Sequence, residues 1–301
     1  MRKFLIYFVL VFLLASCGSS TEERRRLSRQ EAARVKRADS LALKVAVLPT
    51  LDCMPLFVAQ ETNLFDTLGV NVRLKRFNAQ MDCDTALVGG SVEGSVSDLF
   101  RTERLRRKGI RLDYLTSTNA YWLLVTNKKA RLKRVSQLGD KMIAMTRYSV
   151  TDYLSDVALK GVKTTANVYR VQINDVRVRL RMLLNNEMDA LWLTEPQATV
   201  ALAHGNHVIA DSRKMGVHAG VIAFRSDLTA DAYRRRQLAL FTKAYNQACD
   251  SLNERGLAHY RRILENYCYL DKSMAARLPK LHYNHVAQPG VSDVGMARGQ
   301  Y

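Results

Sequence analysis

The chain has 301 residues and a formal net charge of +18 at pH 7, from 46 basic and 28 acidic side chains. The basic residues are spread over the whole length, without zinc-finger spacing, an aromatic RNA-binding signature or a recognition helix. We therefore predict no nucleic-acid partner, and assign the excess charge to solubility or to contact with an anionic surface. The length suffices for one large or two smaller α/β units.

The first residues have the form of an export signal. Two basic residues precede an apolar run over residues 4–14, which suits a signal peptide and is too short to span a bilayer comfortably. The segment 14–17 (LASC) resembles the lipobox of bacterial lipoproteins. We predict that residues 1–16 are a lipoprotein signal peptide and that Cys17 is acylated, which anchors the chain to a bacterial membrane facing the periplasm or the cell exterior. An ordinary secretory signal that ends in cysteine is the alternative.

Residues 17–42 are dense in Arg, Lys and Glu, and their apolar residues are too sparse to build a core. We predict a solvated tether, for which a helix is one option, and a folded body that begins at Leu43.

Short apolar strands alternate with helical patterns through the body, which predicts parallel sheets with right-handed crossovers. The expected strands are 44–48, 70–74, 92–96, 121–125, 141–145, 168–173, 189–193, 208–210 and 221–224. The strand at 121–125 is expected to leave a first lobe and the strand at 221–224 to return to it. We therefore expect two α/β lobes, with 43–118 and 219–301 in the first lobe and 119–218 in the second, and a ligand cleft between them.

Several short segments occur in an order that is typical of one group of proteins. They are 48–61 (LPTLDCMPLFVAQE), 64–65, 69–70, 89–98 (GGSVEGSVSD), 149–151 (SVT), 188–191 (MDAL), 194–198 (TEPQA), 210–212 and 241–246 (FTKAYN). The chain resembles the solute-binding proteins of nitrate, sulfonate, taurine and thiamine-precursor transport systems. The resemblance implies an α/β type II periplasmic-binding-protein fold with two hinge crossings. It also implies a monomeric non-enzyme without cofactor that delivers a small-molecule solute to an ABC transporter permease.

Ligands of open parallel sheets bind at the carboxyl ends of the strands. This rule selects the loops at 50–54, 78–83 and 97–98 in the first lobe, and at 147–151 and 194–196 in the second. The candidate ligand-binding residues are Asp52, Cys53, Met54, Gln80, Asp82, Ser97, Asp98, Arg147, Ser149, Thr151 and Glu195.

The loop at 147–151 suits an anion. Ser149 and Thr151 offer hydroxyls and free backbone N–H groups at a helix start, although ordinary N-capping explains them equally well. Arg147 either pairs with a sulfonate, carboxylate or phosphate or is a solvated charge.

The acidic residues favour a different ligand. Asp52, Asp82, Asp98 and Glu195 would suit amino donors such as those of an aminopyrimidine, unless Asp52 and Asp98 are only helix caps. These carboxylates favour a nitrogen-rich heterocycle of the thiamine-pyrimidine type over a simple anion such as a sulfonate. The tryptophans, at 122 and 192, lie inside apolar strands and are expected to pack in the core rather than on a ligand.

Four cysteines remain after Cys17, an even number that permits disulfides in an oxidising compartment. Cys53 and Cys83 follow strands expected to be neighbours, so a disulfide there is one option and a pair of buried free thiols the other. Cys249 and Cys268 form a weaker candidate pair. No Cys or His spacing indicates a metal site.

Two other function classes are weighed against solute binding. The first is an enzyme of thiamine- or menaquinone-type biosynthesis on the same fold, but the sequence pairs no nucleophile with a positioned base, and the export signal argues against it. The second is a scaffold lipoprotein without a transport role, which a filled cleft or a large exposed apolar patch would favour.

Overall fold

The computed structural model describes residues 21–300, so the expected signal peptide and Cys17 lie outside the described residues. The chain divides into an N-terminal unit that ends at Ala42 and a compact body from Leu43 onward. The described part of the N-terminal unit is helix α2 (Thr21–Leu41), so this part of the expected tether is helical. No helix in the range 21–300 is both long and apolar enough to cross a membrane.

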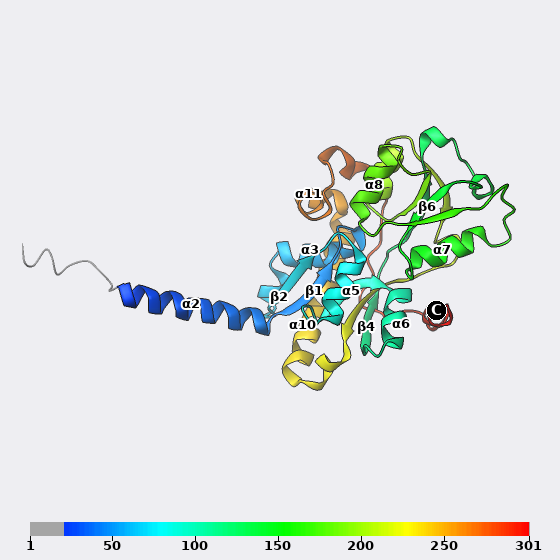
Figure 1. Ribbon diagram of the computed structural model, residues 1–301. Helices are drawn as coiled ribbons and strands as arrows, with labels where there is room; N and C mark the ends of the chain where they lie inside the picture. Colours follow the sequence, from blue (N-terminus) through cyan, green and yellow to red (C-terminus); the bar gives the residue numbers. More distant parts are fainter. Residues whose placement is uncertain (1–20, 301) are drawn as a thin grey trace, which may run out of the picture. The chain divides into compact units, whose positions relative to one another are not determined.

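The body contains two mixed β-sheets, each of five strands (Figure 1). The first sheet has the order β2-β1-β3-β10-β4 and the second the order β7-β6-β8-β5-β9. The strands of the first are β1 (Leu43–Val47), β2 (Val72–Arg76), β3 (Gly94–Asp98), β4 (Leu112–Ser117) and β10 (Gly220–Arg225). Those of the second are β5 (Leu123–Thr126), β6 (Met142–Met145), β7 (Tyr169–Gln172), β8 (Ala190–Leu193) and β9 (His207–Asp211). We call the first sheet with its helices the first lobe and the second sheet with its helices the second lobe.

Two strands run against their neighbours, which the expected parallel sheets did not include. β10 pairs antiparallel with β3 and β4, and β5 pairs antiparallel with β8 and β9. Both follow a crossing between the lobes, after β9 and β4 respectively. The other strands have their carboxyl ends at the edge where the lobes meet. A strand that directly follows a crossing begins at this edge, so it runs in the opposite direction to its neighbours. The alternation pattern also missed β4 itself, because its buried positions do not alternate regularly.

Helices cover both sheets. Those of the first lobe are α3 (Met54–Glu61), α4 (Leu64–Thr67), α5 (Gln80–Val88), α6 (Leu99–Arg107), α10 (Ala232–Arg255), α11 (Arg261–Cys268) and α12 (Val291–Gly299). Those of the second are α7 (Val150–Leu159), α8 (Val176–Leu184) and α9 (Gln197–Ala203). Five of these ten helices within residues 43–300 (α5, α6, α7, α8 and α9) begin directly or within a short loop after a strand. The two-lobed α/β architecture expected from the sequence is confirmed.

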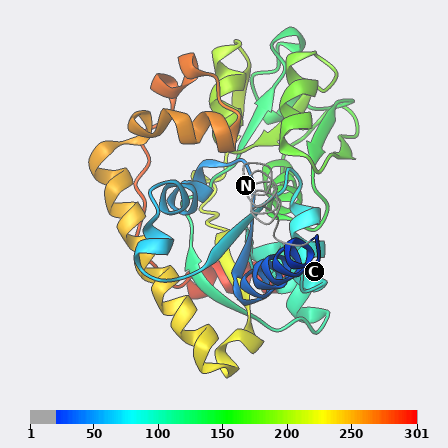
Figure 2. The same ribbon diagram turned by 90° about the vertical axis from the view of Figure 1, so that its left-hand side faces the viewer.

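The long helix α10 lies along the outside of the first lobe (Figure 2). Its Phe241 is fully buried and stacks on Phe65 of α4 with ring centroids 5.7 Å apart. The ring of Phe224 on β10 meets the same side chain edge-on at 5.5 Å. This aromatic cluster fixes α10 against the sheet. Helix α12, which the sequence did not indicate, packs on α6, where Arg298 pairs with Glu103.

Successive residues of β1 point to opposite faces of the first sheet and so belong to two separate cores. Val45 and Val47 pack in the large cluster under α3 and α10, together with Cys53. Ala46 and Leu48 pack on the other face. That second cluster contains Cys83.

Of the two options for Cys53 and Cys83, the disulfide is not formed, because the sheet separates the two side chains. Cys249 and Cys268 are not bonded either: the Sγ of Cys249 donates to the carbonyl of Asn284, and Cys268 lies beside the carbonyl of Thr50. All four cysteines are buried free thiols, which confirms the alternative. Burial raises the pKa of each thiol, that of Cys249 to about 12. Buried thiols of this kind are expected to be unreactive in the folded protein.

We predict that reductant leaves the melting temperature of the protein unchanged, since none of the four described cysteines forms a disulfide. Thiol titration should find Cys53, Cys83, Cys249 and Cys268 unreactive in the native protein and all four reactive after unfolding in denaturant without reductant. A lower melting temperature in reductant, or fewer reactive thiols after unfolding, would contradict the assignment.

Candidate ligand-binding site

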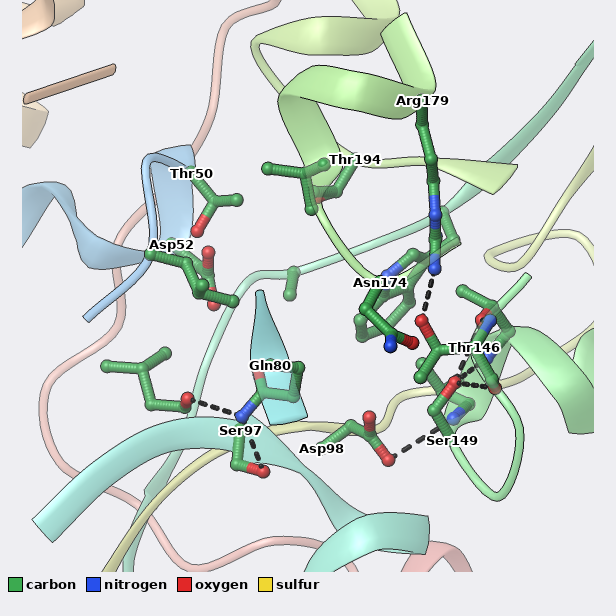
Figure 3. Close-up of a pocket in the computed structure, with 17 residues that line it drawn as sticks. Thr50, Asp52, Gln80, Ser97, Asp98, Thr146, Ser149, Asn174, Arg179 and Thr194 are labelled. Atoms are coloured by element: carbon green, nitrogen blue, oxygen red, sulfur yellow. Dashed lines mark hydrogen bonds between the residues drawn. The ribbon is translucent and has the colours of Figure 1, made fainter. Parts of the chain in front are cut away.

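A cavity of about 70 Å³ lies where the carboxyl ends of the two sheets face each other (Figure 3). The first lobe contributes Thr50, Asp52, Gln80, Ser97 and Asp98 as polar groups, and the second contributes Thr146, Ser149, Thr151, Asn174, Arg179 and Thr194. The apolar wall consists of Leu48, Val96, Ala120, Trp122, Val150 and Val176. The rule that ligands bind at the carboxyl ends of strands therefore selects a cavity to which both lobes contribute.

Asp98 ends strand β3 and caps helix α6. Its Oδ1 accepts a hydrogen bond from the backbone N–H of Arg101 at 3.0 Å. The same oxygen accepts a second bond, at 3.2 Å, from the N–H of Val150 in the first turn of α7 in the opposite lobe. Figure 3 shows the other carboxylate oxygen pointing toward the cavity. One side chain thus ends a strand, starts a helix and bridges the lobes.

Three hydrogen bonds to backbone carbonyls also join the lobes. The N–H of Leu51 donates to the carbonyl of Glu195 at 2.9 Å, and the Nε2 of Gln197 donates to the carbonyl of Pro49 at 2.8 Å. The N–H of Val176 donates to the carbonyl of Asn78 at 3.1 Å. Residues that end strands in one lobe thus satisfy polar groups of the other.

The two acidic residues of the cavity are held away from bulk water. Burial raises the pKa of Asp98 to about 7, against the opposing effect of the nearby Arg101 guanidinium. Arg101 is itself paired with Asp84 through its Nε at 2.7 Å. Burial also raises the pKa of Asp52, although hydrogen bonds from Thr50 and Thr118 oppose this. Both carboxyl groups therefore stay protonated to a higher pH than an exposed aspartate does.

Arg179 of α8 is the basic group of the cavity, and its side chain is 4% exposed. Its Nε donates to the carbonyl of Ile173 at 2.6 Å, its Nη1 donates to that of Trp192 at 3.2 Å, and its Nη2 contacts the Thr146 hydroxyl. None of the ion pairs found within residues 21–300 includes Arg179. Burial lowers its pKa to about 10, which still leaves it charged at neutral pH.

The start of α7 is built as an N-cap. The Oγ of Ser149 accepts from the N–H of Thr151 at 3.1 Å and donates to the carbonyl of Thr146 at 2.7 Å. The Oγ1 of Thr151 accepts from the N–H of Thr146 at 2.9 Å. The capping interpretation is therefore confirmed. Both side chains also line the cavity, so the ligand interpretation stays a prediction.

Six of the eleven candidate residues line the cavity: Asp52, Gln80, Ser97, Asp98, Ser149 and Thr151. The structure places the other five elsewhere. Cys53 and Met54 point into the core of the first lobe, because the chain turns into η1 (Leu51–Cys53) and α3 directly after the Thr50 loop. Asp82 and Arg147 are exposed, and Asp82 lines a separate cavity of about 310 Å³.

Glu195 is buried but turned away from the cavity. Its carboxylate accepts from the Tyr121 hydroxyl at 2.8 Å and from the N–H and hydroxyl of Thr199 at 3.0 and 2.7 Å. These bonds engage both oxygens, so the side chain fixes the start of α9. Trp192 is fully buried with its Nε1 bonded to Ser155, which confirms core packing. Trp122 contacts the core of the second lobe and also lines the cavity.

Sequence reasoning missed Arg179, Asn174 and Thr146. Thr146 and Asn174 lie in the loops after β6 and β7, where the strand-end rule applies. The loop selected after β6 began one residue later, at 147, and no loop was selected after β7. Arg179 carried a signal in its spacing. It stands three residues after Val176 and four before Leu183, on the buried face of an amphipathic helix, where an apolar residue is expected.

Two properties of residues 21–300 bear on the chemistry of the site. No group of three or more His, Cys, Asp or Glu side chains within residues 21–300 could hold a metal ion. The cavity lining includes neither a histidine nor a cysteine among these residues. Its polar groups can bind a ligand by hydrogen bonds and charge.

Comparisons with known proteins agree with this geometry. Residues 36–261 match the NMT1-like family, as the resemblance in the sequence predicted. A comparison with curated protein sequences gives no match.

Several solved structures share the fold. The ligand-binding component of an ABC-type import system from Staphylococcus aureus, with zinc bound, has a TM-score of 0.70 at 13% identity, covering 86% of this chain and 91% of that chain. The alkanesulfonate-binding protein SsuA from Xanthomonas axonopodis pv. citri, bound to MOPS, has a TM-score of 0.69 at 18% identity, covering 85% and 89%. The nitrate-binding protein NrtA from Synechocystis PCC 6803 has a TM-score of 0.66 at 14% identity, covering 77% and 68%. Identities this low establish the shared fold alone.

We predict that Asp98→Asn flattens the dependence of stability on pH between about 4 and 7. The folded protein holds a proton on Asp98 up to a pKa of about 7, whereas an unfolded aspartate loses it near pH 4. The folded state therefore binds more protons in this window, and the free energy of unfolding falls as pH rises, by about 1.4 kcal/mol per unit of pKa difference at most. Asn retains the N-cap. Denaturant unfolding at several pH values measures the slope.

The exposed Asp113 on β4 provides the control for this measurement. Asp113→Asn removes one surface charge and is expected to leave the slope as in the parent. An Asp98→Asn protein with the parent's slope would show that Asp98 is not protonated in the folded state.

Proposed function

Because this chain belongs to the NMT1-like family, we propose that it is an extracytoplasmic solute-binding protein that captures a small polar molecule between its lobes and delivers it to an ABC importer. The observation that carries the proposal is the cavity at the carboxyl ends of both sheets, lined by polar groups from each lobe. Its neighbours in fold include ligand-binding, alkanesulfonate-binding and nitrate-binding proteins of bacterial import systems.

Lobe closure supports reversible capture. The bonds from Asp98 to Val150 and from Leu51 to Glu195 join groups of opposite lobes, and opening the lobes would expose them to water at little net cost. We place the hinge at the two crossings between the sheets, near 118–119 and 218–219. A ligand that contacts both lobes stabilises the closed state by its differential affinity for that state, and release requires only that the lobes separate.

The size of the cavity favours a small solute. About 70 Å³ is well below the ~300–1,000 Å³ typical of pockets for drug-sized ligands. Of the two ligands considered from the sequence, a small sulfonate fits this volume better than a thiamine-pyrimidine heterocycle. The acidic residues that favoured the heterocycle, Asp52 and Asp98, still line the cavity and must be accounted for by any ligand.

The remaining parts of the proposal rest on the sequence. Export, acylation of Cys17 and attachment of the monomeric body through the tether at 17–42 would keep the binding site near the membrane and its permease. The described part of that tether is the α2 helix, with exposed Arg24, Arg25 and Arg29.

The enzyme alternative has less support. Among the described residues, the cavity lining contains no histidine, cysteine or lysine, which are frequent bases or nucleophiles in covalent catalysis. A scaffold role would be favoured by a filled cleft, and the cavity argues against it.

We predict that the purified protein, incubated with the low-molecular-weight fraction of bacterial culture extract, binds one small solute that native mass spectrometry detects. At a hundredfold excess over its dissociation constant, the solute should stabilise the protein by about 2.7 kcal/mol and raise the melting temperature. Asn174→Trp should abolish capture, because the indole would fill the cavity. Lys163→Trp, in an exposed loop of the same lobe, should capture the solute as the parent does.

Two results would count against the proposal. One is a folded parent protein that neither retains a solute nor gains stability from any fraction. The other is a solute that Asn174→Trp retains as well as the parent, since binding would then occur outside the cavity.

A further inference from the structure

The cavity has a basic side and an acidic side. Figure 3 shows Arg179 directed at Thr146 on one side, and Asp52 and Gln80 on the other, with Asp98 beneath the cavity. The basic group belongs to the second lobe and both acidic groups belong to the first. Charge is thus separated across the cleft that a ligand would fill.

Arg179 needs an anion. It is almost fully buried, and its hydrogen-bond partners are the carbonyls of Ile173 and Trp192 and the hydroxyl of Thr146, which are all neutral. The charge of Asp175 acts on Arg179, but no ion pair joins the two and burial outweighs the effect of Asp175. A buried charge without a paired opposite charge is costly. Three of the five guanidinium N–H groups have a partner here, which leaves donors for the acidic group of a ligand.

Asp52 and Asp98 need a donor. Asp98 uses Oδ1 for two backbone N–H groups, while its other oxygen faces the cavity. Asp52 accepts a long hydrogen bond, 3.4 Å, from the Thr118 hydroxyl and is also hydrogen-bonded by Thr50, so its partners are neutral hydroxyl and backbone groups. The Arg101 guanidinium that acts on Asp98 is also engaged by Asp84. A ligand ammonium would supply both the charge and several N–H donors.

Ligands of a single charge leave one side of the cavity unsatisfied. A simple anion pairs with Arg179 but then faces two carboxyl groups, which must be protonated to accept it. A simple amine pairs with the carboxylates but leaves Arg179 without a counter-ion. A molecule with both groups satisfies both sides at once.

We propose that the natural ligand is a small zwitterion that places its acidic group against Arg179, Thr146 and Asn174 of the second lobe and its ammonium group against Asp52 and Asp98 of the first. The proposal rests on the proposed solute-binding function and names its ligand class. Because the two charges of the ligand contact opposite lobes, the zwitterion also draws the lobes together. The small volume restricts the spacer between the charges to a short chain.

Matched ligands test the proposal on the unaltered protein by isothermal titration calorimetry. Taurine, β-alanine and 2-aminoethylphosphonate carry both charges, ethanesulfonate, propionate and ethylphosphonate lack the amine, and ethylamine lacks the acid. At least one zwitterion should bind tenfold or more tightly than its desamino partner and than ethylamine. Equal or tighter binding of every desamino partner would overturn the proposal, and so would the absence of binding by all three zwitterions.

The pH dependence separates the two ligand types in the same assay. The charged groups that act on Asp98 are Arg101 on its own helix and Asp84 on α5, while Asp52 and Arg179 line the same cavity and α7 donates the Val150 N–H to Asp98. An ammonium needs the ionised carboxylates, so zwitterion affinity should rise between pH 6 and pH 8, around the pKa of about 7 for Asp98. An anion needs them protonated, so the affinity of ethanesulfonate should fall. A zwitterion affinity that falls over this range contradicts the assignment.

Variants assign the two ends of the ligand. Asp52→Asn should weaken zwitterion binding at least tenfold and leave or improve the binding of the desamino anion. Arg179→Gln should weaken both, whereas Arg181→Gln, an exposed arginine on the same helix, should weaken neither. If Arg179→Gln fails to fold, the ligand series and Asp52→Asn still decide the matter. Capture from extract of a solute that lacks either charge would overturn this inference while supporting the proposed function.

Discussion

The carboxyl ends of the two sheets face each other, and the polar groups at these ends require partners across the cleft. Asp98 illustrates the constraint, because one carboxylate oxygen caps α6 in its own lobe and the first turn of α7 in the other. The backbone bonds from Leu51 to Glu195 and from Val176 to Asn78 follow the same logic. Protein groups thus satisfy many of the polar groups at the interface, and the small cavity beside Asp98 is lined by polar groups that a ligand can still contact.

The composition of that cavity follows from which strand or helix ends there. The first lobe supplies carboxyl groups from the ends of β1 and β3, and the second supplies hydroxyls and a buried guanidinium. Burial acts on both kinds of charge in opposite directions, raising the pKa of Asp98 and lowering that of Arg179. Burial therefore disfavours the charged form of each group, and a ligand of complementary charge would stabilise that form when it binds.

Buried thiols show where local sequence reasoning stops. Cys53 and Cys83 follow strands that do pair with neighbours in one sheet, which made a disulfide reasonable. In the structure, the two cysteines pack on opposite faces of the sheet. Side chains alternate between faces only within a strand, so the sequence pattern does not predict the face of a residue beyond the strand end. Arg147 and Arg179 show the same limit. Arg147 was selected for its position in a strand-end loop but is exposed, whereas Arg179 is buried at the cavity but lies in a helix, to which the strand-end rule does not apply.

Sequence alone determined the class of fold, the order of most strands and helices, the family and the loops at the cleft, since these depend on local periodicity, on caps such as Ser149 and on the rule for strand ends. It also selected Asp52, Ser97 and Asp98 correctly as cavity residues. Only the tertiary structure decided the antiparallel direction of β5 and β10, the free state of the cysteines, the inward turn of Glu195 toward Tyr121 and the burial of Arg179. These properties depend on which groups meet across distant segments, and such contacts form only when both lobes are packed.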